Sequence, residues 1–235
     1  MPTRAPAPER AVVLSMGGSV LLTGHNDRQY LEDLATLLRE VGRKIPLVVT
    51  TGGGRTAREY IHLGRELGLT EVELDEIGID VTRLHARLLA ARIGPPTPAH
   101  PPTTVALAVH ELQRGSPVIL GGTEPGHTTD GVGALVAARL RASRFINATD
   151  VNGIYEHDPR TNPRARRIAK SSWVDFRRRV QMSTTGEAGQ NFLFDRLGAD
   201  ILWRAGIPLL VVDGRNLANL EAAIRGHPFD GSRVE

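Results

Sequence analysis

Short apolar runs alternate with longer amphipathic segments through most of the chain. The runs show no alternation with polar residues, which is typical of strands covered on both faces. Between them, apolar residues recur every three or four positions, which is typical of helices. This order predicts an α/β fold, a three-layer αβα sandwich with a mainly parallel central sheet. The runs predicted to form strands are 11–16, 45–49, 117–121, 144–148 and 207–212.

The predicted helices fill the intervals between these runs. We expect Asn216 to cap the last helix and residues 231–235 to add an edge strand. Residues 94–102, "GPPTPAHPP", predict a surface loop, because proline fixes φ and lacks an N–H donor. We therefore expect a flexible tail, 1–10, and a single domain, 11–235. The segments predicted to be helical are 30–41, 55–67, 72–92, 103–114, 131–140, 192–205 and 217–224.

Composition limits the classes of function. The chain has 235 residues and a formal net charge of +3, so charge alone does not indicate a nucleic-acid partner. It contains no cysteine, which excludes disulfides, thiolate metal sites and a cysteine nucleophile and fits a cytoplasmic protein. No apolar run reaches the ~18–20 residues that span a bilayer, so we expect no membrane partner. The histidines show no HxxH or HExxH spacing, so we expect no metal site built by the protein alone.

Basic residues gather in one region, 164–180, in the stretches "RARRIAK" and "DFRRRV". Two interpretations are open. The region is either a solvated charged surface or a positive field that guides an anionic substrate.

Glycine-rich segments follow four of the predicted strands. They read "GGS", "TGGG", "GGTEPGHTTD" and "TDVNG" in chain order. The carboxyl ends of parallel strands meet at one edge of the sheet, where such sheets bind ligands. Glycine lets a ligand approach the backbone closely, and exposed N–H groups suit phosphates. The chain has no GxxxxGK[ST] loop and no GxGxxG after the first strand, so it is neither a P-loop enzyme nor a standard dinucleotide binder.

The third of these segments carries Thr128, Thr129 and Asp130 where a helix begins. One interpretation is capping, because threonine and aspartate side chains accept hydrogen bonds from the first turn of a helix. The other is ligand binding, because a helix N-terminus with a glycine-rich approach attracts anions. The residues alone leave both open.

The order of these motifs resembles the amino acid kinase superfamily, and within it the archaeal-type uridylate (UMP) kinases. The resemblance implies a three-layer αβα sandwich, a homohexamer, and transfer of the γ-phosphoryl group of ATP to UMP with Mg²⁺ brought by ATP. It also implies an acceptor-binding part, about 11–140, and an ATP-binding part, about 141–235. The segments that carry it are "VVLSMGGSVL", "VVTTGGGRTAREYI", "ELDEIGIDVTRLHARLL", "GGTEPGHTTDGVGALVA", "ATDVNGIYEHDPR" and "FDRLGADILWRAGI".

The family's roles transfer onto matching positions as expectations. The positions expected beside the reacting phosphoryl group are Gly17, Gly18, Asp130 and Asp150. The positions expected to bind UMP are Gly53, Gly54, Arg58, Asp75, Gly78, Thr82, Thr128 and Thr129. The positions expected to bind ATP are Gly17, Gly18, Ser19, Thr149, Asp150, Gly153, Tyr155, Asp158 and Pro159. By this resemblance the threonines at 128 and 129 contact the acceptor phosphate, and a cap and a phosphate can share neighbouring donors.

The chain departs from the family at positions that matter for catalysis. Many members carry lysine where this chain has Ser15, and the family usually carries lysine where it has Asp200. His85 stands where relatives often have asparagine. We expect Asp200 to turn away from the phosphates or to pair with an arginine such as Arg204. Two alternatives to a UMP kinase stay open: a nucleotide- or oxyanion-binding storage protein on the same fold, and a kinase for another small phosphate acceptor.

Overall fold

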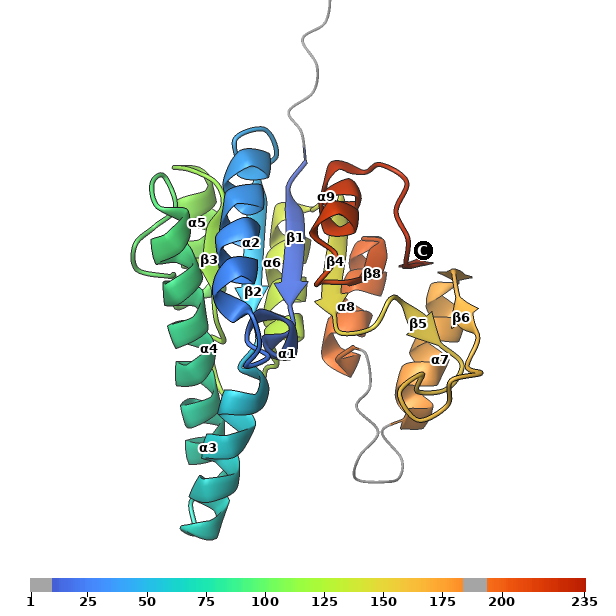
Figure 1. Cartoon of the computed structure of the whole chain (residues 1–235), viewed down its shortest axis with the longest axis horizontal. Coiled ribbons are helices and arrows are strands. Elements are labelled where there is room, and N and C mark those ends of the chain that lie inside the picture. Colours follow the sequence, from blue (N-terminus) through green and yellow to red (C-terminus); the bar gives the residue numbers. More distant parts are fainter. Residues whose placement is uncertain (1–9, 184–193) are drawn as a thin grey trace, which may run out of the picture.

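The structure, a computed structural model, describes residues 10–183 and 194–235 and is built around a seven-stranded sheet (Figure 1). The order of the strands across the sheet is β3-β2-β1-β4-β8-β9-β7. The five strands from β3 to β8 run parallel, β9 is antiparallel to β8, and β7 is parallel to β9. The prediction of a mainly parallel sheet is confirmed. The strands are β1 Val12–Met16, β2 Leu47–Thr51, β3 Val118–Leu120, β4 Arg144–Thr149, β7 Lys170–Ser171, β8 Leu209–Asp213 and β9 Ser232–Val234.

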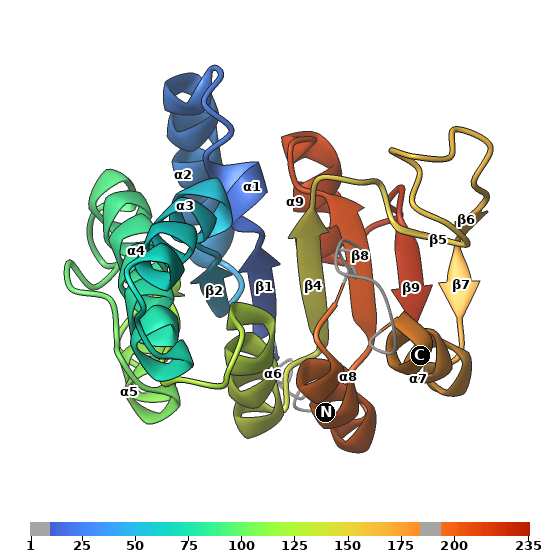
Figure 2. The same ribbon diagram turned by 90° about the horizontal axis from the view of Figure 1, so that it is seen from below.

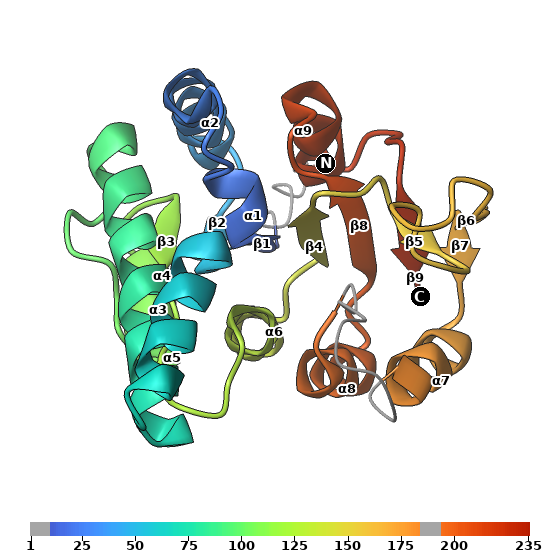
Figure 3. The same cartoon turned by 60° about the horizontal axis from the view of Figure 1, so that its bottom comes forward.

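Helices cover both faces of this sheet, as the apolar runs predict (Figures 2 and 3). One apolar cluster joins the sheet to α2, α9 and the end of α4, and the other joins it to α5, α6, α7 and α8. Figure 3 shows α2 and α9 on one side of the strands and α6, α8 and α7 on the other. The helices are α1 Gly18–Leu21, α2 Asp27–Gly42, α3 Gly54–Glu66, α4 Glu71–Ile93, α5 Val105–Leu112, α6 Thr129–Leu140, α7 Trp173–Ser183, α8 Arg196–Ala205 and α9 Leu217–Arg225.

Residues alternate between the two clusters along β1, and this alternation positions one polar side chain. Val12, Leu14 and Met16 pack into the α2 cluster, whereas Val13 packs into the α6 cluster. Successive side chains of a strand point to opposite faces, so Ser15 lies on the α6 side. Ser15 is buried there, in contact with α6.

The ends of several elements follow their local sequence. Thr70 and Glu73 form a reciprocal capping box that starts α4, and Gly94, with φ of 75°, follows its end. Asn216 accepts a hydrogen bond from the Asn219 N–H, so the predicted cap of the last helix is confirmed. Residues 94–102 carry no helix or strand, as their prolines predict.

One predicted strand position and one predicted helix start need correction, and most of one predicted segment lies outside the described residues. The segment 231–235 is not at an edge, because β9 lies between β8 and β7. The helix expected over 192–205 begins at Arg196, because the Asp195 side chain caps it by accepting hydrogen bonds from the backbone N–H groups of Leu197 and Gly198. Most of the predicted tail, residues 1–9, lies outside the described residues. The division into acceptor and ATP parts stays a prediction.

The basic stretch, 164–180, contains strands and part of a helix that the periodicity of apolar residues did not predict. Trp173, Phe176 and Val180 are buried on one face of α7, while Arg178 and Arg179 are exposed. Before α7, a short antiparallel pair, β5 Ile154–Tyr155 and β6 Arg167–Ile168, extends the loop that follows β4. Over the described ranges, 10–183 and 194–235, no helix is both long and apolar enough to span a membrane.

Candidate active site

The two glycine loops that follow β1 and β2 contact each other directly. The backbone N–H of Gly52 donates to the Met16 carbonyl at 2.9 Å, which joins the ends of the two strands. A Cβ on Gly18 would collide with the backbone of Gly53 and Gly54, and it would lie 2.6 Å from the Gly52 carbonyl oxygen. Only glycine fits this contact. The structure therefore brings the predicted residues of both loops together at the carboxyl edge of the sheet.

The start of α3 forms one side of this edge. Gly53 occupies the N-cap position, and Gly54 has φ of 57°, a left-handed conformation that glycine adopts without strain. Arg55 and Arg58 follow within the first two turns, and both are exposed. Free N–H groups, the helix dipole and two guanidinium groups all favour an anion here.

Side chains and the backbone of helix α4 hold the loops after β2 and β3 in place through hydrogen bonds. The Thr51 hydroxyl donates to the Thr82 carbonyl at 2.9 Å, and the Gly122 N–H donates to the Thr82 hydroxyl at 2.7 Å. Nδ1 of the buried His85 lies 2.8 Å from the Gly52 carbonyl oxygen. Arg83 donates to the carbonyl oxygen of Gly122. The hydroxyl of Thr82 is thus engaged inside the protein, and α4 fixes the positions of both loops.

The question of capping at residues 128–130 has a structural answer. Thr128 is the N-cap of α6, and its hydroxyl accepts the Gly131 N–H at 3.1 Å. Thr129 begins the helix. In the loop before it, Asp75 of α4 accepts the Gly126 N–H at 2.9 Å and remains exposed. Capping is therefore confirmed for Thr128, while a contact of either threonine with phosphate stays a prediction.

Asp130 is the most perturbed carboxyl group at this edge. The Ser15 hydroxyl, from β1, donates to Asp130 Oδ1 at 2.5 Å. The pKa of this carboxyl is raised from 3.8 to about 6, chiefly because burial disfavours the charged form; the bond from Ser15 opposes this rise and the charge of Asp195 adds to it. Near neutral pH a small change in surroundings can therefore change its charge, which is a property of functional carboxylates.

The end of β4 presents a second charged group of residues. Arg160 reaches back to Asp150, with 3.2 Å between Nη1 and Oδ2, and pairs with Asp158 at 3.0 Å. The hydrogen bonds from Arg160 lower the pKa of Asp158. Thr149 donates to Asp150 at 3.2 Å, so the predicted ATP residues around 149–159 form one loop tied by Arg160. Gly153, with φ of 115°, lies against Ser232 of β9.

The other predicted ATP positions occupy the same region. Tyr155 lies in β5, half-buried and paired with Arg167 of β6, and Pro159 is half-buried. Ser19 lies in the single turn of α1, directly after the loop of β1. Gly78, which is predicted to bind UMP, lies in α4, where a Cβ would approach Ile61 to 3.3 Å.

The Asp200 carboxylate forms an ion pair within the protein. Arg177 of α7 donates to it through Nε at 2.6 Å, and the same guanidinium lies 3.9 Å from the centre of the Trp203 ring. The expectation that an arginine pairs with Asp200 is confirmed, but the partner is Arg177 rather than Arg204. The charge reversal at this position is neutralised locally.

Sequence reasoning did not find several of these residues. Arg83, Arg160 and Arg177 were not predicted, because each bonds to a loop or helix that local sequence patterns do not place beside it. His85 was noted only as a departure from relatives. No group of three histidine, aspartate or glutamate side chains could hold a metal ion within the part of the chain that the structure describes. Asp150 presents a half-exposed carboxylate of the kind that can contribute one oxygen to Mg²⁺.

A parallel sheet with glycine-rich loops and a helix N-terminus at its carboxyl edge defines a phosphate-binding α/β protein. The chain belongs to the Amino acid kinase family, whose profile matches residues 10–213. The resemblance read from its motifs is confirmed.

Comparison with individual relatives narrows the resemblance to one kind of enzyme within this family. The chain is 40% identical over 223 residues to a uridylate kinase from Methanothrix thermoacetophila, which covers 95% of this chain and 98% of the relative. It is also 40% identical over 228 residues to a uridylate kinase from Methanococcoides burtonii, with 95% and 97% covered. The crystal structure of the uridylate kinase from Archaeoglobus fulgidus superposes with a TM-score of 0.85 at 36% identity, covering 96% of this chain and all of that one.

Proposed function

We propose that this chain is a UMP kinase that transfers the γ-phosphoryl group of ATP to the phosphate of UMP, giving UDP and ADP. One observation carries the proposal. The interlocked loops at Gly18 and Gly52–Gly54 join the start of α3 at the sheet edge, in a chain 40% identical to uridylate kinases over nearly its full length. The loop contact leaves no room for side chains, so the backbone itself faces the phosphates. Phosphoryl transfer depends mainly on such positioning and on neutralisation of charge.

The acceptor side of the site is formed by α3, α4 and α6. Gly53, Gly54 and Arg58 bind the phosphate of UMP, with the guanidinium able to grip two oxygens at once. Thr128 and Thr129 direct hydroxyls toward the same phosphate from the start of α6. Along α4, Asp75, Gly78 and Thr82 border the nucleoside. Thr82 acts there through its support of Gly122, because its hydroxyl is already bonded.

The donor side is formed by the loops after β1 and β4. Gly17, Gly18 and Ser19 direct backbone N–H groups at the phosphates of ATP. Thr149, Asp150, Gly153, Tyr155, Asp158 and Pro159 line the nucleotide.

Mg²⁺ accompanies ATP. When bound, it would neutralise charge on the phosphates through oxygen ligands and water, and Asp150 would supply a carboxylate oxygen to it.

The missing lysines do not exclude catalysis. An unpaired carboxylate ~4 Å from a phosphate oxygen would repel it by about 4 kcal/mol at an effective dielectric of about 20. Asp200 avoids this cost because Arg177 pairs with it. Ser15 bonds to Asp130 and so orients the carboxyl nearest the proposed reaction. These contacts favour an enzyme over the storage protein that the altered positions first suggested.

An exposed apolar surface on α3 and α4 supports assembly of several copies, and we propose a homohexamer. Tyr60 and Leu63 on α3 and Leu67, which directly follows it, form a stripe at helical spacing, and each is more than half exposed. Leu84 and Leu88, four positions apart on α4, are also at least half exposed. Apolar areas of this kind mark interfaces between proteins. Light scattering should give the mass of a hexamer, and Leu63→Asp should shift it toward smaller species; a monomeric native protein contradicts the proposal.

The acceptor is tested with a coupled assay of ADP release. UMP, CMP, dUMP and isopentenyl phosphate are compared as acceptors at equal concentration with ATP and Mg²⁺. We expect UMP to give the highest kcat/KM. A higher value for isopentenyl phosphate would assign the chain to another small phosphate acceptor, and no release with any acceptor would favour the storage alternative. The absence of cysteine suits a cytoplasmic location for this enzyme.

A further inference from the structure

One arginine beside the proposed donor site bonds to a distant part of the chain. Arg215 lies in the loop after β8, at the carboxyl edge of the sheet. The backbone N–H of its neighbour Gly214 donates to the carbonyl oxygen of Thr149, a residue expected to bind ATP, at 2.9 Å. The motifs in the sequence assign no role to Arg215. Its contacts indicate one.

The guanidinium group of Arg215 contacts the turn between α1 and α2 and the first turn of α2. Nη2 donates to the Thr23 hydroxyl at 2.6 Å and lies 3.4 Å from Asp27 Oδ1. The guanidinium carbon lies 4.2 Å from the centre of the Tyr30 ring. A hydrogen bond, an ion pair and a cation–π contact therefore hold one side chain in a single position.

Asp27 holds this turn in one conformation. Its Oδ1 accepts hydrogen bonds from the Thr23 N–H at 2.9 Å and from the Thr23 hydroxyl at 2.8 Å, and its Oδ2 accepts the Gly24 N–H at 2.6 Å. The Thr23 hydroxyl thus accepts from Arg215 and donates to Asp27. Because Arg215 bonds to a turn that is already held together, the contact fixes the position of the whole turn relative to the loop after β8.

The turn directly follows α1, the single helical turn Gly18–Leu21. The start of α1 is fixed by the contact of Gly18 with the glycine loop after β2. Its other end lies against the loop after β8, because a Cβ on Gly214 would lie 2.7 Å from a methyl group of Val20. The Tyr30 hydroxyl donates to the Gly214 carbonyl at 2.8 Å and joins this loop to α2. Arg215 thus belongs to a set of contacts that fixes the far end of α1.

Folding alone gives little reason for the arginine. Tyr30 is 8% exposed and is bonded to Gly214 without it. Asp27 already accepts hydrogen bonds from the backbone and the hydroxyl of its own turn. The Arg215 side chain is 29% exposed, where an ion pair contributes little to stability, and fixing a long side chain costs conformational entropy. The contact therefore serves the position of α1 more than the stability of the fold.

We propose that Arg215 is a positioning residue of the donor phosphate site. Through Thr23 and Asp27 it fixes α1, and with it the backbone N–H groups of residues 17–19 that are proposed to face the phosphates of ATP. Arg215 acts through this turn and does not itself contact the nucleotide. Displacement of reacting groups by about 1 Å can cost about a hundredfold in rate, so a small shift of α1 is sufficient to lower turnover. The inference rests on the proposed kinase function and extends it beyond the glycine loops.

The test compares Arg215→Gln with the native chain in two assays. Calorimetric titration with a non-hydrolysable ATP analogue and Mg²⁺, without UMP, measures binding at the donor site. The assay of ADP release with UMP measures kcat and the KM of each substrate. We expect Arg215→Gln to weaken binding of the analogue about tenfold, the effect of misdirecting one hydrogen bond to a charged group. The KM for ATP should rise by a similar factor, and kcat should fall.

The acceptor side should be affected less. Gly18 remains packed against Gly53 and Gly54, and this contact does not involve Arg215. The KM for UMP should therefore change much less than the KM for ATP. A variant that merely lost part of its folded population would have a lower kcat with both KM values unchanged, so the difference between the two KM values separates positioning from stability.

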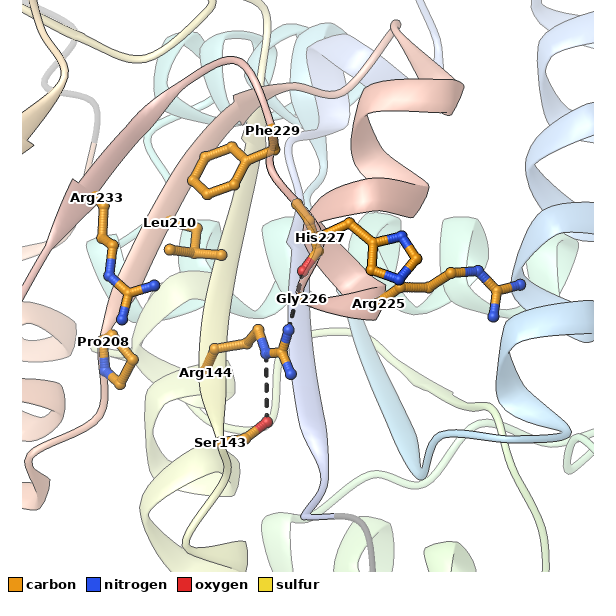
Figure 4. Close-up of a pocket in the computed structure, with 10 residues that line it drawn as sticks. Ser143, Arg144, Pro208, Leu210, Arg225, Gly226, His227, Phe229 and Arg233 are labelled. Atoms are coloured by element: carbon orange, nitrogen blue, oxygen red, sulfur yellow. Dashed lines mark hydrogen bonds between the residues drawn. The ribbon is translucent and has the colours of Figure 1, made fainter.

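Arg225→Gln is the matched control. Arg225 ends α9 and lies beside a pocket at the opposite edge of the sheet, where β4 and β8 begin (Figure 4). Its side chain is 25% exposed and pairs with Glu221 at 2.7 Å, so it resembles Arg215 in burial and in pairing. The variant should leave the binding of the analogue and both KM values unchanged.

A second variant tests the route through the turn. Thr23→Val removes the hydroxyl that links Arg215 to Asp27 with little change in size. It should raise the KM for ATP, as Arg215→Gln does. The double variant should be no worse than Arg215→Gln alone, because both changes break the same connection. Effects that add in full would show that Arg215 does not act through Thr23 and would overturn the inference.

Two results with the single variant would overturn the inference while leaving the kinase in place. One is that Arg215→Gln matches Arg225→Gln in both assays. The other is a lower kcat with unchanged KM values and unchanged binding of the analogue, which would indicate loss of folded protein. If the native chain releases no ADP with UMP, the proposed function fails, and the titration still decides the inference: weaker binding of the analogue in Arg215→Gln supports it, and equal binding overturns it.

Discussion

Replacement of Asp130 by asparagine should stabilise the protein above pH 6 and reduce its activity. The folded protein holds the pKa of this carboxyl at about 6, against 3.8 for the free group. Because the folded pKa is raised, the unfolded chain loses this proton at a lower pH than the folded protein does. The free energy of unfolding therefore falls as pH rises from about 4 to about 6, and it stays lower above that range. At 1.36 kcal/mol per pKa unit, the cost of ionising the folded group is up to about 3 kcal/mol.

Asparagine keeps an oxygen that can accept the Ser15 hydroxyl but carries no charge. Urea unfolding of the native chain and of Asp130→Asn at pH 4 and pH 8 measures the difference. The variant should be more stable at pH 8, by up to about 3 kcal/mol, and the two should converge at pH 4. Asp33→Asn, an exposed change on α2, is the control and should show no such pH dependence.

A second variant, Ser15→Ala, tests the same pKa shift. It removes the hydrogen bond that lowers the folded Asp130 pKa, so the fall in stability should begin near pH 4 as before but continue to a higher pH. An Asp130→Asn protein that is less stable than the native chain at pH 8, or equally shifted at both pH values, would refute this reasoning. A fall in kcat alongside the gain in stability would show that the carboxyl is retained for function rather than for folding.

Three further predictions concern the proposed reaction. Arg58→Ala should weaken UMP binding by ~1.5–3 kcal/mol in calorimetry, the range for a hydrogen bond to a charged group, while ATP binding changes little; unchanged UMP affinity would remove Arg58 from the site. Gly18→Ala should abolish turnover, because the added Cβ collides with the Gly52–Gly54 backbone, whereas normal turnover would show that the two loops need not touch. Native turnover with UMP and ATP should fall in the ~1–100 s⁻¹ range of kinases. Asp200→Lys should reduce it, because the new cation faces Arg177; turnover only in the variant would identify the native chain as a binding protein.

The sheet and its ligand-binding edge could be predicted because they follow from local patterns. Fully apolar runs determine buried strands, and parallel strands bring the glycine segments after β1, β2 and β3 to one edge. The capping of α6 by Thr128 could be predicted because it depends only on residue types within four positions of the helix start. These features depend on a few neighbouring positions, so the sequence alone contains them.

The charged contacts could not be predicted in the same way. Ser15 and Asp130 are 115 positions apart, and Arg177 and Asp200 are 23 apart on two different helices. No local pattern shows which arginine meets which carboxylate. Helix α7 was missed because its arginines conceal a short apolar face, and β9 was misplaced because its neighbour β7 is only two residues long.

The central claim, phosphoryl transfer from ATP to UMP, is tested most directly by following the phosphate itself. The protein is incubated with UMP, Mg²⁺ and ATP labelled in the γ-phosphate, and the nucleotides are separated. The account predicts label in the β-phosphate of UDP, in an amount equal to the ADP formed, and a strong loss of this product in Arg58→Ala. Label that remains in ATP, or appears only as free phosphate while UMP stays unchanged, would contradict it.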